Sequence, residues 1–384
     1  HMEASMRETL EAHLDDFDIS EDLGFVLEDP LTTLPDYYRV WMDLANNLTH
    51  LIESHKLRDR MPVLSPHLLN NHRELMLAHL ALGFISMGYV WQEGQHSPVL
   101  PKALALPYWL VSRRLGLPPI LTYADSVLAN WKLKNPAGNM DLIFSFPGGD
   151  SSKGFFLVSL LVEMAASSGL MVSAGCCYSP CFVISLAFCP FIFNFSAEHV
   201  DPDVFHGTLR IFVSGQPMLP GGLVYEGVSN EPILLSGGSA AQSSAIQCFD
   251  ALLGVHHAED TGAYLTRMRD YMPPAHRQLI ETLSVLPSLR DFILACSSPD
   301  LCQAYNTCVS ALVDLRSYHL NTVTKYIIVP GNSARTTGCP LRGAGDALKA
   351  TGTGGTNLMS FLKSVRNTTQ NVLIPERPSM SREV

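Results

Sequence analysis

Apolar residues recur every three to four positions along much of the chain, a spacing that predicts α-helices. The clearest pattern covers residues 65–91 and opens with Ser65 and Pro66, a cap residue followed by a proline at the first helical position. Residues 117–136 show a second pattern, which is entered through two prolines and closed by a third. We expect one helix in each of these segments.

Three further segments extend the helical pattern. Residues 154–166 ("GFFLVSLLVEMAA") are apolar all round, which predicts a helix that is buried on every side. Residues 236–254 begin with small residues and then become amphipathic, and residues 272–283 start at two prolines. Strand patterns are few and short, so the sequence predicts a mostly α-helical fold.

The longest predicted helix covers residues 300–327, and one histidine lies on its apolar stripe. The inward positions step by three and four residues. They are Leu301, Tyr305, Cys308, Leu312, Leu315, His319, Thr322 and Tyr326. Arg316, three residues before His319, lies on nearly the same face. Two interpretations stay open: a hydrogen-bonded core histidine, or a ligand to a bound group with a metal centre and an acidic rim, such as haem.

A stretch rich in glycine, proline and serine at 144–154 separates two parts of the chain and is the candidate domain boundary. We expect a small N-terminal α-rich domain at residues 1–147 and a large all-α domain at residues 148–384. Within the large domain, residues 331–356 are rich in glycine and threonine, which predicts a mobile loop.

Composition and charge exclude several partners. The chain of 384 residues carries a net charge of −10, without the basic excess that binding to nucleic acid requires. Its nine cysteines lack zinc-type spacing, which indicates free thiols in a reducing compartment. No basic segment followed by an apolar run opens the chain, so we expect a cytoplasmic protein. The uncharged stretch at 164–197 is interrupted by glycine and prolines, and we expect no stable membrane insertion.

A candidate pocket begins with Phe155 and Ser159, which are four residues apart and therefore share a helix face. An aromatic ring and a hydroxyl on one face could line a pocket for a flat apolar ligand. Plain core packing is the alternative, with the Ser159 hydroxyl bonded to a carbonyl one turn earlier. Gly237 and Gly238 carry no Cβ and would let the backbone approach a planar group closely.

Six long segments follow one another in the chain: "LPPILTYADSVLANWKLKNP", "SFPGGDSSKGFFLVSLLVE", "GGSAAQSSAIQCFD", "RDYMPPAH", "LRSYHLNTVTKYI" and "GTGGTNLMSFLKSVR". Together they resemble the indoleamine 2,3-dioxygenase family, over about residues 16–163 and 199–376. Details such as "MGYVWQEG" and "HVDPDVF" are closer to the second vertebrate paralogue than to the first. The resemblance implies a haem b enzyme that inserts both atoms of O2 across the indole C2–C3 bond of L-tryptophan, which yields N-formylkynurenine.

The resemblance also implies a set of cofactor-binding residues. His319 would be the proximal ligand of the haem iron. Arg316 would contact a haem propionate, with Asp250 as its partner. The haem edge and the substrate ammonium would be bordered by Ser239, Ala240 and Thr353.

A second set of residues would bind the substrate. The distal indole pocket would be lined by Tyr123, Ser126, Val127, Phe155 and Ser159. Phe205 would stack on the substrate, and Arg210 would pair with its carboxylate. The candidate catalytic residues are accordingly Phe155, Ser159, Phe205 and Arg210.

Two segments depart from the family's pattern. Residues 164–198 are almost free of charge where the family has charged amphipathic helices, and the loop after Gly215 is short. His206 stands where the relatives usually have an aromatic residue. Both breaks flank Phe205 and Arg210, so we expect weak tryptophan-cleaving activity. The alternatives are a haem protein that binds O2 or signals through an unknown partner protein without turnover, and a chain whose large domain fails to assemble.

Overall fold

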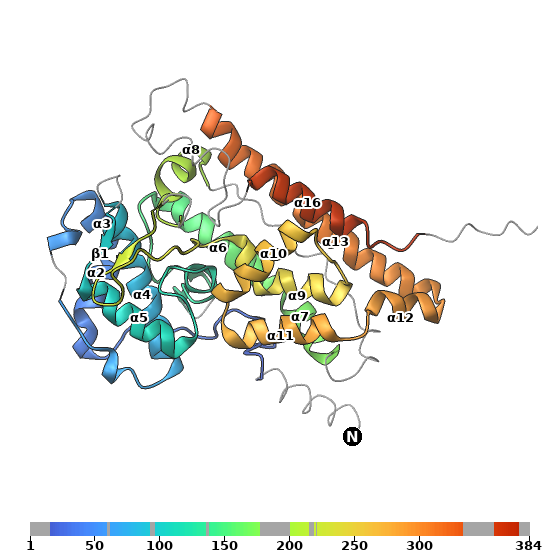
Figure 1. Ribbon diagram of the computed structural model, residues 1–384, viewed down its shortest axis with the longest axis horizontal. Helices are drawn as coiled ribbons and strands as arrows, with labels where there is room; N and C mark the ends of the chain where they lie inside the picture. The colour runs from blue at the N-terminus through green and yellow to red at the C-terminus, as the bar shows by residue number, and fades with distance from the viewer. Residues whose placement is uncertain are drawn as a thin grey trace, which may run out of the picture.

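The computed structural model describes residues 16–59, 62–92, 97–135, 138–176, 200–214, 219, 221–332 and 357–375 (Figure 1). α-Helices dominate this part of the chain, so the predicted mostly α fold is confirmed. In chain order the α-helices are α2 (Arg39–Asn46), α3 (Leu48–Glu53), α4 (His72–Trp91), α5 (Lys102–Leu115), α6 (Gly149–Ala165), α7 (Ser167–Cys176), α8 (Pro202–Val204), α9 (Ser244–Leu253), α10 (Glu259–Met268), α11 (Pro274–Val285), α12 (Leu289–Cys296), α13 (Pro299–Val323) and α16 (Leu358–Gln370).

The strands of the described residues form two short pairs. β1 (Val99–Leu100) pairs in parallel with β4 (Val224–Tyr225). β2 (Lys132–Leu133) pairs antiparallel with β3 (Met140–Asp141). Each strand is two residues long, so the strands do not form a sheet layer.

α4 is the central helix of the N-terminal half, and α2, α3 and α5 pack against it. Every residue from Leu75 to Gly88 is buried. Gly83 and Gly88 permit this packing, because a Cβ at either position would lie 2.9 Å from a neighbouring side chain. By length and composition α4 could cross a membrane, but 89% of its apolar window is buried inside the protein, as in a core helix. α6 and α7 pass the same test only as a pair, which is bent by 42°.

α13 is the main helix of the C-terminal half, with 25 residues, and it packs along α16 and against α12. Its N-terminus is capped by Ser298, whose hydroxyl accepts a hydrogen bond from the Leu301 amide. The predicted stripe is buried at Tyr305 and Leu312 and becomes half-buried towards His319. The position that prompted the haem interpretation is therefore less enclosed by protein than the first half of the same stripe.

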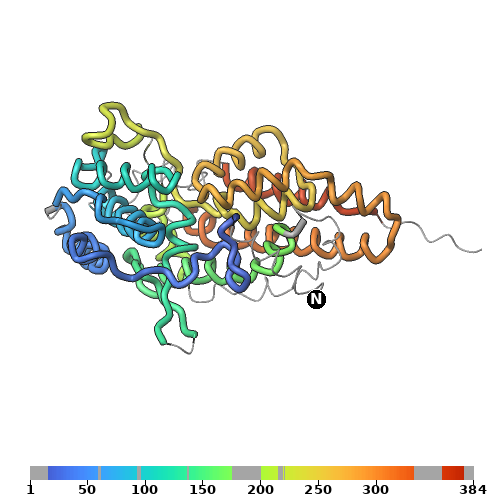
Figure 2. The backbone as a smooth tube through the Cα atoms, turned by 90° about the horizontal axis from the view of Figure 1, so that it is seen from below, coloured from blue at the N-terminus to red at the C-terminus, as the bar shows by residue number. Residues whose placement is uncertain are grey.

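Two views show how the halves are arranged. α2 to α5 gather at one end of the molecule, and α12 and α13 lie at the other (Figures 1 and 2). However, β1 pairs with β4 from the second half, and the buried apolar side chains form one cluster across both halves. The division at residues 147 and 148 therefore stays a prediction.

Three π-helical turns interrupt the helical pattern: η4 (Ala124–Leu128), η7 (Phe205–Leu209) and η10 (Thr324–Ile328). η10 continues α13, so the helix predicted at 300–327 is confirmed in extent and only its last turn is wider. Such turns are rare and often occur at functional sites. η4 contains the predicted site residues Ser126 and Val127, and η7 begins at Phe205. η10 follows the helix that carries His319.

The predicted helix at 65–91 begins later than expected. Ser65 is followed by a single 3-10 turn, η3 (Pro66–Leu68), and it makes no capping hydrogen bond. α4 starts at His72, because the Asn71 side chain accepts a hydrogen bond from the Glu74 amide and caps the helix there.

The prediction of one helix at 117–136 is wrong. The described part of this segment contains the short turn η4 and the two-residue strand β2. The Asp125 carboxylate accepts a hydrogen bond from the Thr122 amide, a local side-chain contact that competes with a regular helix.

The prediction that residues 154–166 are buried on every side is also wrong. Phe156 and Leu160 on α6 are buried, whereas Phe155 and Ser159 are only half-buried. One face of α6 thus packs into the core and the other is partly open. The mobile loop predicted at 331–356 lies outside the described residues, apart from 331 and 332, which are helical.

Candidate functional site

Aromatic rings connect α6 and η7, which carry predicted site residues, with η10, which continues α13 beyond His319. The centroid of the Phe155 ring on α6 lies 4.9 Å from that of Phe205, the first residue of η7. The Phe205 ring in turn lies 6.1 Å from the Tyr326 ring of η10 and is nearly perpendicular to it, at 88°. The fold therefore brings Phe155 and Phe205 together, although 50 positions separate them in the sequence.

Ser159 lies one turn after Phe155 on the same half-buried face of α6. Its hydroxyl donates a hydrogen bond of 3.1 Å to the Phe155 carbonyl oxygen. This is the bond expected if Ser159 is an ordinary packing residue. The hydroxyl is thus already satisfied by the helix backbone.

Tyr123, Ser126 and Val127 lie in or directly before η4, which contacts α6. Ser126 and Val127 are buried, and the Ser126 hydroxyl donates to the Thr122 carbonyl oxygen at 3.1 Å. Tyr123 is half-buried and donates through its phenol to Glu163 at 2.9 Å. This segment and α6 therefore meet through a specific polar contact as well as through apolar packing.

Glu163 is a residue of this region that sequence reasoning missed. It is 2% exposed, and its Oε1 accepts hydrogen bonds from Tyr123 at 2.9 Å and from Ser243 at 2.6 Å. Burial raises the pKa of its carboxyl group, which opposes ionisation. A signal was present, because Glu163 is the one charged residue of the apolar stretch 154–166 and follows Phe155 and Ser159 at a spacing of four.

Arg210 directly follows η7 and is 2% exposed. Burial lowers the pKa of its guanidinium to about 10, so the side chain is still positively charged at neutral pH. A buried, charged guanidinium can pair strongly with a carboxylate.

His206, four positions before Arg210, is half-buried. Its Nε2 atom is buried and has no hydrogen-bond partner among the described residues. Burial and the positive charge of Arg210 lower the pKa of His206, so the imidazole is neutral at physiological pH.

The loop with Ser239 and Ala240 lies beside the Tyr123 segment. Gln242 joins them, since its side-chain oxygen accepts a hydrogen bond from the Tyr123 amide at 3.0 Å. A Cβ at Gly238 would lie 3.7 Å from the Leu121 carbonyl oxygen, which is an ordinary contact. Packing within the chain therefore does not require a glycine at this position, and the close approach of the backbone to a bound planar group stays a prediction. Thr353 lies outside the described residues.

His319 is half-buried on α13 and makes no hydrogen bond or ion pair within the part of the chain that the structure describes. Burial, together with the positive charge of Arg316, lowers the pKa of its imidazole. The ring is therefore neutral at physiological pH, the form that binds a metal. The alternative of a hydrogen-bonded core histidine finds no support in these contacts.

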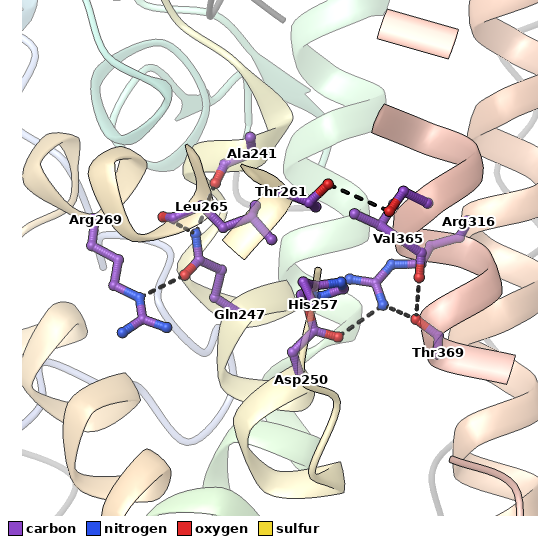
Figure 3. A network of polar contacts seen from close by, with 11 residues as sticks. Ala241, Gln247, Asp250, His257, Thr261, Leu265, Arg269, Arg316, Val365 and Thr369 are labelled. Atoms are coloured by element: carbon purple, nitrogen blue, oxygen red, sulfur yellow. Dashed lines mark hydrogen bonds and ion pairs between the residues drawn. The ribbon is translucent and has the colours of Figure 1, made fainter. Parts of the chain in front are cut away.

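Arg316 is buried and binds Asp250 through both terminal nitrogens, at 2.8 Å from Nη1 to Oδ1 and 2.7 Å from Nη2 to Oδ2 (Figure 3). Its Nη1 also donates to the Thr369 hydroxyl, and His257 approaches Asp250 at 2.7 Å. Burial is the largest influence on the pKa of Asp250 and raises it, but Arg316 and His257 together lower it below its usual value. The burial of Arg316 is thus explained by Asp250 and does not by itself require an acidic ligand.

A second polar cluster lies on the same helix, α9, one turn before Asp250 (Figure 3). The Gln247 side chain donates to the Ala241 and Leu265 carbonyl oxygens at 3.1 and 3.0 Å. It accepts a hydrogen bond from Arg269 at 2.8 Å. These contacts hold the loop after Ser239 against α9 and α10.

Comparison with known proteins shows the family to which this chain belongs. The sequence model of the family described as "Indoleamine 2,3-dioxygenase" matches residues 13–177 and 189–372. The chain belongs to the indoleamine 2,3-dioxygenase family, as predicted. The match extends through α7 and resumes before residue 199, so the segment that departs from the family is shorter than the predicted 164–198.

Individual relatives cover nearly the whole chain. Indoleamine 2,3-dioxygenase 2 of Homo sapiens is 48% identical, over 94% of this chain and 96% of its own. Indoleamine 2,3-dioxygenase 1 of Rattus norvegicus is 45% identical, over 97% of this chain and 99% of its own. A protein named myoglobin, from Haliotis madaka, is 38% identical over 94% of this chain and 98% of its own.

Proposed function

We propose that this protein is a haem-dependent dioxygenase that cleaves the indole C2–C3 bond of L-tryptophan with O2 and forms N-formylkynurenine. The observation that carries the proposal is the state of His319. In a chain matched by the family model on both sides of it, this residue offers a neutral imidazole without a protein partner among the described residues.

The residues present fit haem b. His319 would ligate the iron, since a neutral imidazole in a half-buried position is a usual axial ligand. The Arg316–Asp250 pair would border the propionates, through guanidinium hydrogens that Asp250 and Thr369 leave free. When bound, the haem supplies the activation of O2.

The residues of the candidate pocket would bind and orient tryptophan. The Phe155 and Phe205 rings offer an apolar surface that matches an indole, and Arg210 offers a positive charge that matches the substrate carboxylate. Tyr123, Ser126 and Val127 would close the pocket from η4, and Ser239, Ala240 and Thr353 would border it. The proposed roles are orientation and exclusion of water, with no strong protein base.

One observation favours a second function. A relative that spans nearly the whole chain is named myoglobin, which suggests that an O2-binding protein can be built on this sequence pattern. An O2-binding protein does not need a buried arginine that pairs with a substrate carboxylate, so the buried Arg210 favours the dioxygenase.

The cellular setting is part of the proposal. Cys248, Cys296, Cys302 and Cys308 form no disulfide among the described residues, which supports a reducing compartment such as the cytoplasm. The proposed partners are L-tryptophan and O2, without nucleic acid and without stable membrane insertion, and a signalling partner protein belongs to the second function only.

The purified full chain, loaded with haem and reduced, should form N-formylkynurenine when L-tryptophan is added in air, as followed by product absorbance. An O2-dependent change of the haem spectrum without product would select the second function. Failure to retain haem would exclude both and indicate a large domain that does not assemble.

Two substitutions test the assigned roles. His319→Ala should abolish the haem absorbance per mole of protein, whereas His276→Gln, at a buried histidine of α11, should retain it. Arg210→Lys should keep part of the affinity for tryptophan, and Arg210→Ala should raise KM at least tenfold, because the carboxylate partner is lost. An Arg210→Ala variant with full turnover would remove the carboxylate assignment.

A further inference from the structure

The N-terminal half contains a fully buried polar pair next to the candidate pocket. His79 of α4 and Asp125 of η4 are both 0% exposed, and Nδ1 of His79 lies 2.7 Å from Oδ1 of Asp125. The other ring nitrogen, Nε2, lies 3.0 Å from the Ser112 hydroxyl and 3.1 Å from the Pro118 carbonyl oxygen. Burying so many polar groups is costly unless all of them are bonded, and here they are.

The partners determine where the protons lie. The Pro118 carbonyl oxygen can only accept, so Nε2 of His79 must carry a proton. One further proton then lies between Nδ1 of His79 and Oδ1 of Asp125. The pair is neutral overall wherever this proton is placed, which makes its complete burial possible without a counter-ion.

The pair continues into the segment that carries Tyr123, Ser126 and Val127. Oδ2 of Asp125 accepts hydrogen bonds from the amide and the hydroxyl of Thr122, each at 2.9 Å. The Thr122 carbonyl oxygen in turn accepts from the Ser126 hydroxyl at 3.1 Å. A continuous chain of hydrogen bonds thus runs from α4 to a predicted pocket residue.

η4 depends on such external bonds for its shape. It has five residues, and a helical turn of this length is not stable on its own. From the other side it is held at Tyr123, which donates to Glu163 and to Gln242. The His79–Asp125 pair attaches η4 to α4.

We propose that His79 and Asp125 are positioning residues for tryptophan: they fix the segment 122–128 so that Tyr123, Ser126 and Val127 form a preorganised wall of the indole pocket. This inference rests on the proposed function, because it takes the substrate from there. It extends that function by assigning part of the substrate affinity to two residues that do not touch the substrate.

Asp125→Ala removes the acceptor and leaves the Thr122 amide and His79 without their partner. Asp125→Asn keeps the network, because its amide oxygen can accept from Thr122 and its amide nitrogen can donate to Nδ1 of a neutral His79. Thr122→Val removes the hydroxyl, with the bond that it donates to Oδ2 of Asp125 and the bond that it accepts from the Asp125 amide, but keeps the Thr122 amide bond. It serves as a milder variant if Asp125→Ala does not fold.

Val90→Ala is the matched control. It removes buried methyl groups from the same helix, eleven residues beyond His79, which is about 16 Å along the helix axis. It destabilises α4 without touching the network.

Two readouts are measured on each variant. Hydrogen–deuterium exchange of the haem-free chain reports the opening of residues 122–131, and equilibrium titration of the haem-loaded protein reports the Kd for L-tryptophan. We expect Asp125→Ala to speed this exchange at least tenfold and to raise Kd and KM at least tenfold, with kcat lowered less than threefold. Thr122→Val should show a smaller change in the same direction, and Asp125→Asn and Val90→Ala should stay within threefold of the parent chain in both readouts.

Equal changes in Asp125→Ala and Val90→Ala would overturn the inference, because the pair would then act only through general stability. Unchanged exchange and Kd in Asp125→Ala, or in Thr122→Val if the former does not fold, would overturn it as well. A parent chain that does not bind tryptophan would instead remove the proposed function. In that case the hydrogen–deuterium exchange of residues 122–131 still decides whether His79 and Asp125 hold the segment 122–128 in place.

Discussion

Arg316 and Asp250 form a two-pronged ion pair between α13 and α9, with N–O distances of 2.8 and 2.7 Å. Both side chains are buried, at 8% and 6% exposure. The pair therefore joins the helix that carries His319 to the helix that follows the Ser239 loop. Removal of one partner leaves the other as an uncompensated charge inside the protein.

Asp250→Ala should lower the free energy of unfolding by about 3–5 kcal/mol, since it leaves Arg316 buried and unpaired. The double variant Asp250→Ala with Arg316→Met should recover most of this loss, because no unpaired charge remains. Urea denaturation of the haem-free forms measures both values. If the double variant is as unstable as the sum of the single ones, the two residues do not act as a pair.

Phe205→Ala and Ser159→Ala should differ sharply. Phe205 is buried between the Phe155 and Tyr326 rings, so its removal should lower kcat/KM at least tenfold and cost about 3 kcal/mol of stability. The Ser159 hydroxyl is bonded to the Phe155 carbonyl oxygen, and Ser159→Ala should change kcat/KM less than threefold. Steady-state kinetics compare the two. A tenfold loss in Ser159→Ala would mean that the hydroxyl turns from the helix towards the substrate.

His206→Phe should stabilise the protein by about 1 kcal/mol, because it removes a buried nitrogen without a hydrogen-bond partner among the described residues. It would also place an aromatic ring beside Phe205, so we expect kcat/KM for tryptophan to rise. Thermal unfolding and product formation measure the two effects. His206→Asn retains an unsatisfied polar group and is the control, for which no gain is expected.

Acid should destabilise the protein through His276. Burial, and the charge of His72, lower the pKa of His276 from its usual 6.5 to about 3 in the folded chain. The unfolded chain binds this proton first as pH falls, so the stability that is complete above pH 6.5 is lost progressively towards pH 3. At pH 5 the loss from this group is about 2 kcal/mol.

His276→Gln should remove this part of the pH dependence, while its amide can still contact the Ser244 hydroxyl. Urea denaturation at pH 7 and pH 5 should show a difference about 2 kcal/mol smaller for the variant than for the parent chain. Identical differences in both proteins would show that His276 is accessible to protons in the folded state.

Local patterns predicted the long elements well. α11 was expected from the two prolines at its start, and α13 from its apolar period. The π-helical turns were not expected, since residues 117–136 have the same apolar spacing as a regular helix. There the side chain of Asp125 bonds to the Thr122 amide and to His79, and the second of these partners lies 46 positions away in the chain.

Sequence by itself determined the family, the mostly α fold, and the candidate set around His319, because these depend on residue types at short and regular spacing. Tertiary structure alone decided which charges are neutralised and which polar atoms are satisfied. Glu163 meets Tyr123 across 40 positions, which nothing in the sequence predicted, and Asp250 meets Arg316 across 66, a pairing that only the family resemblance implied. The electrostatic energy of a buried group depends on its partners in space, and no local spacing in the chain encodes them.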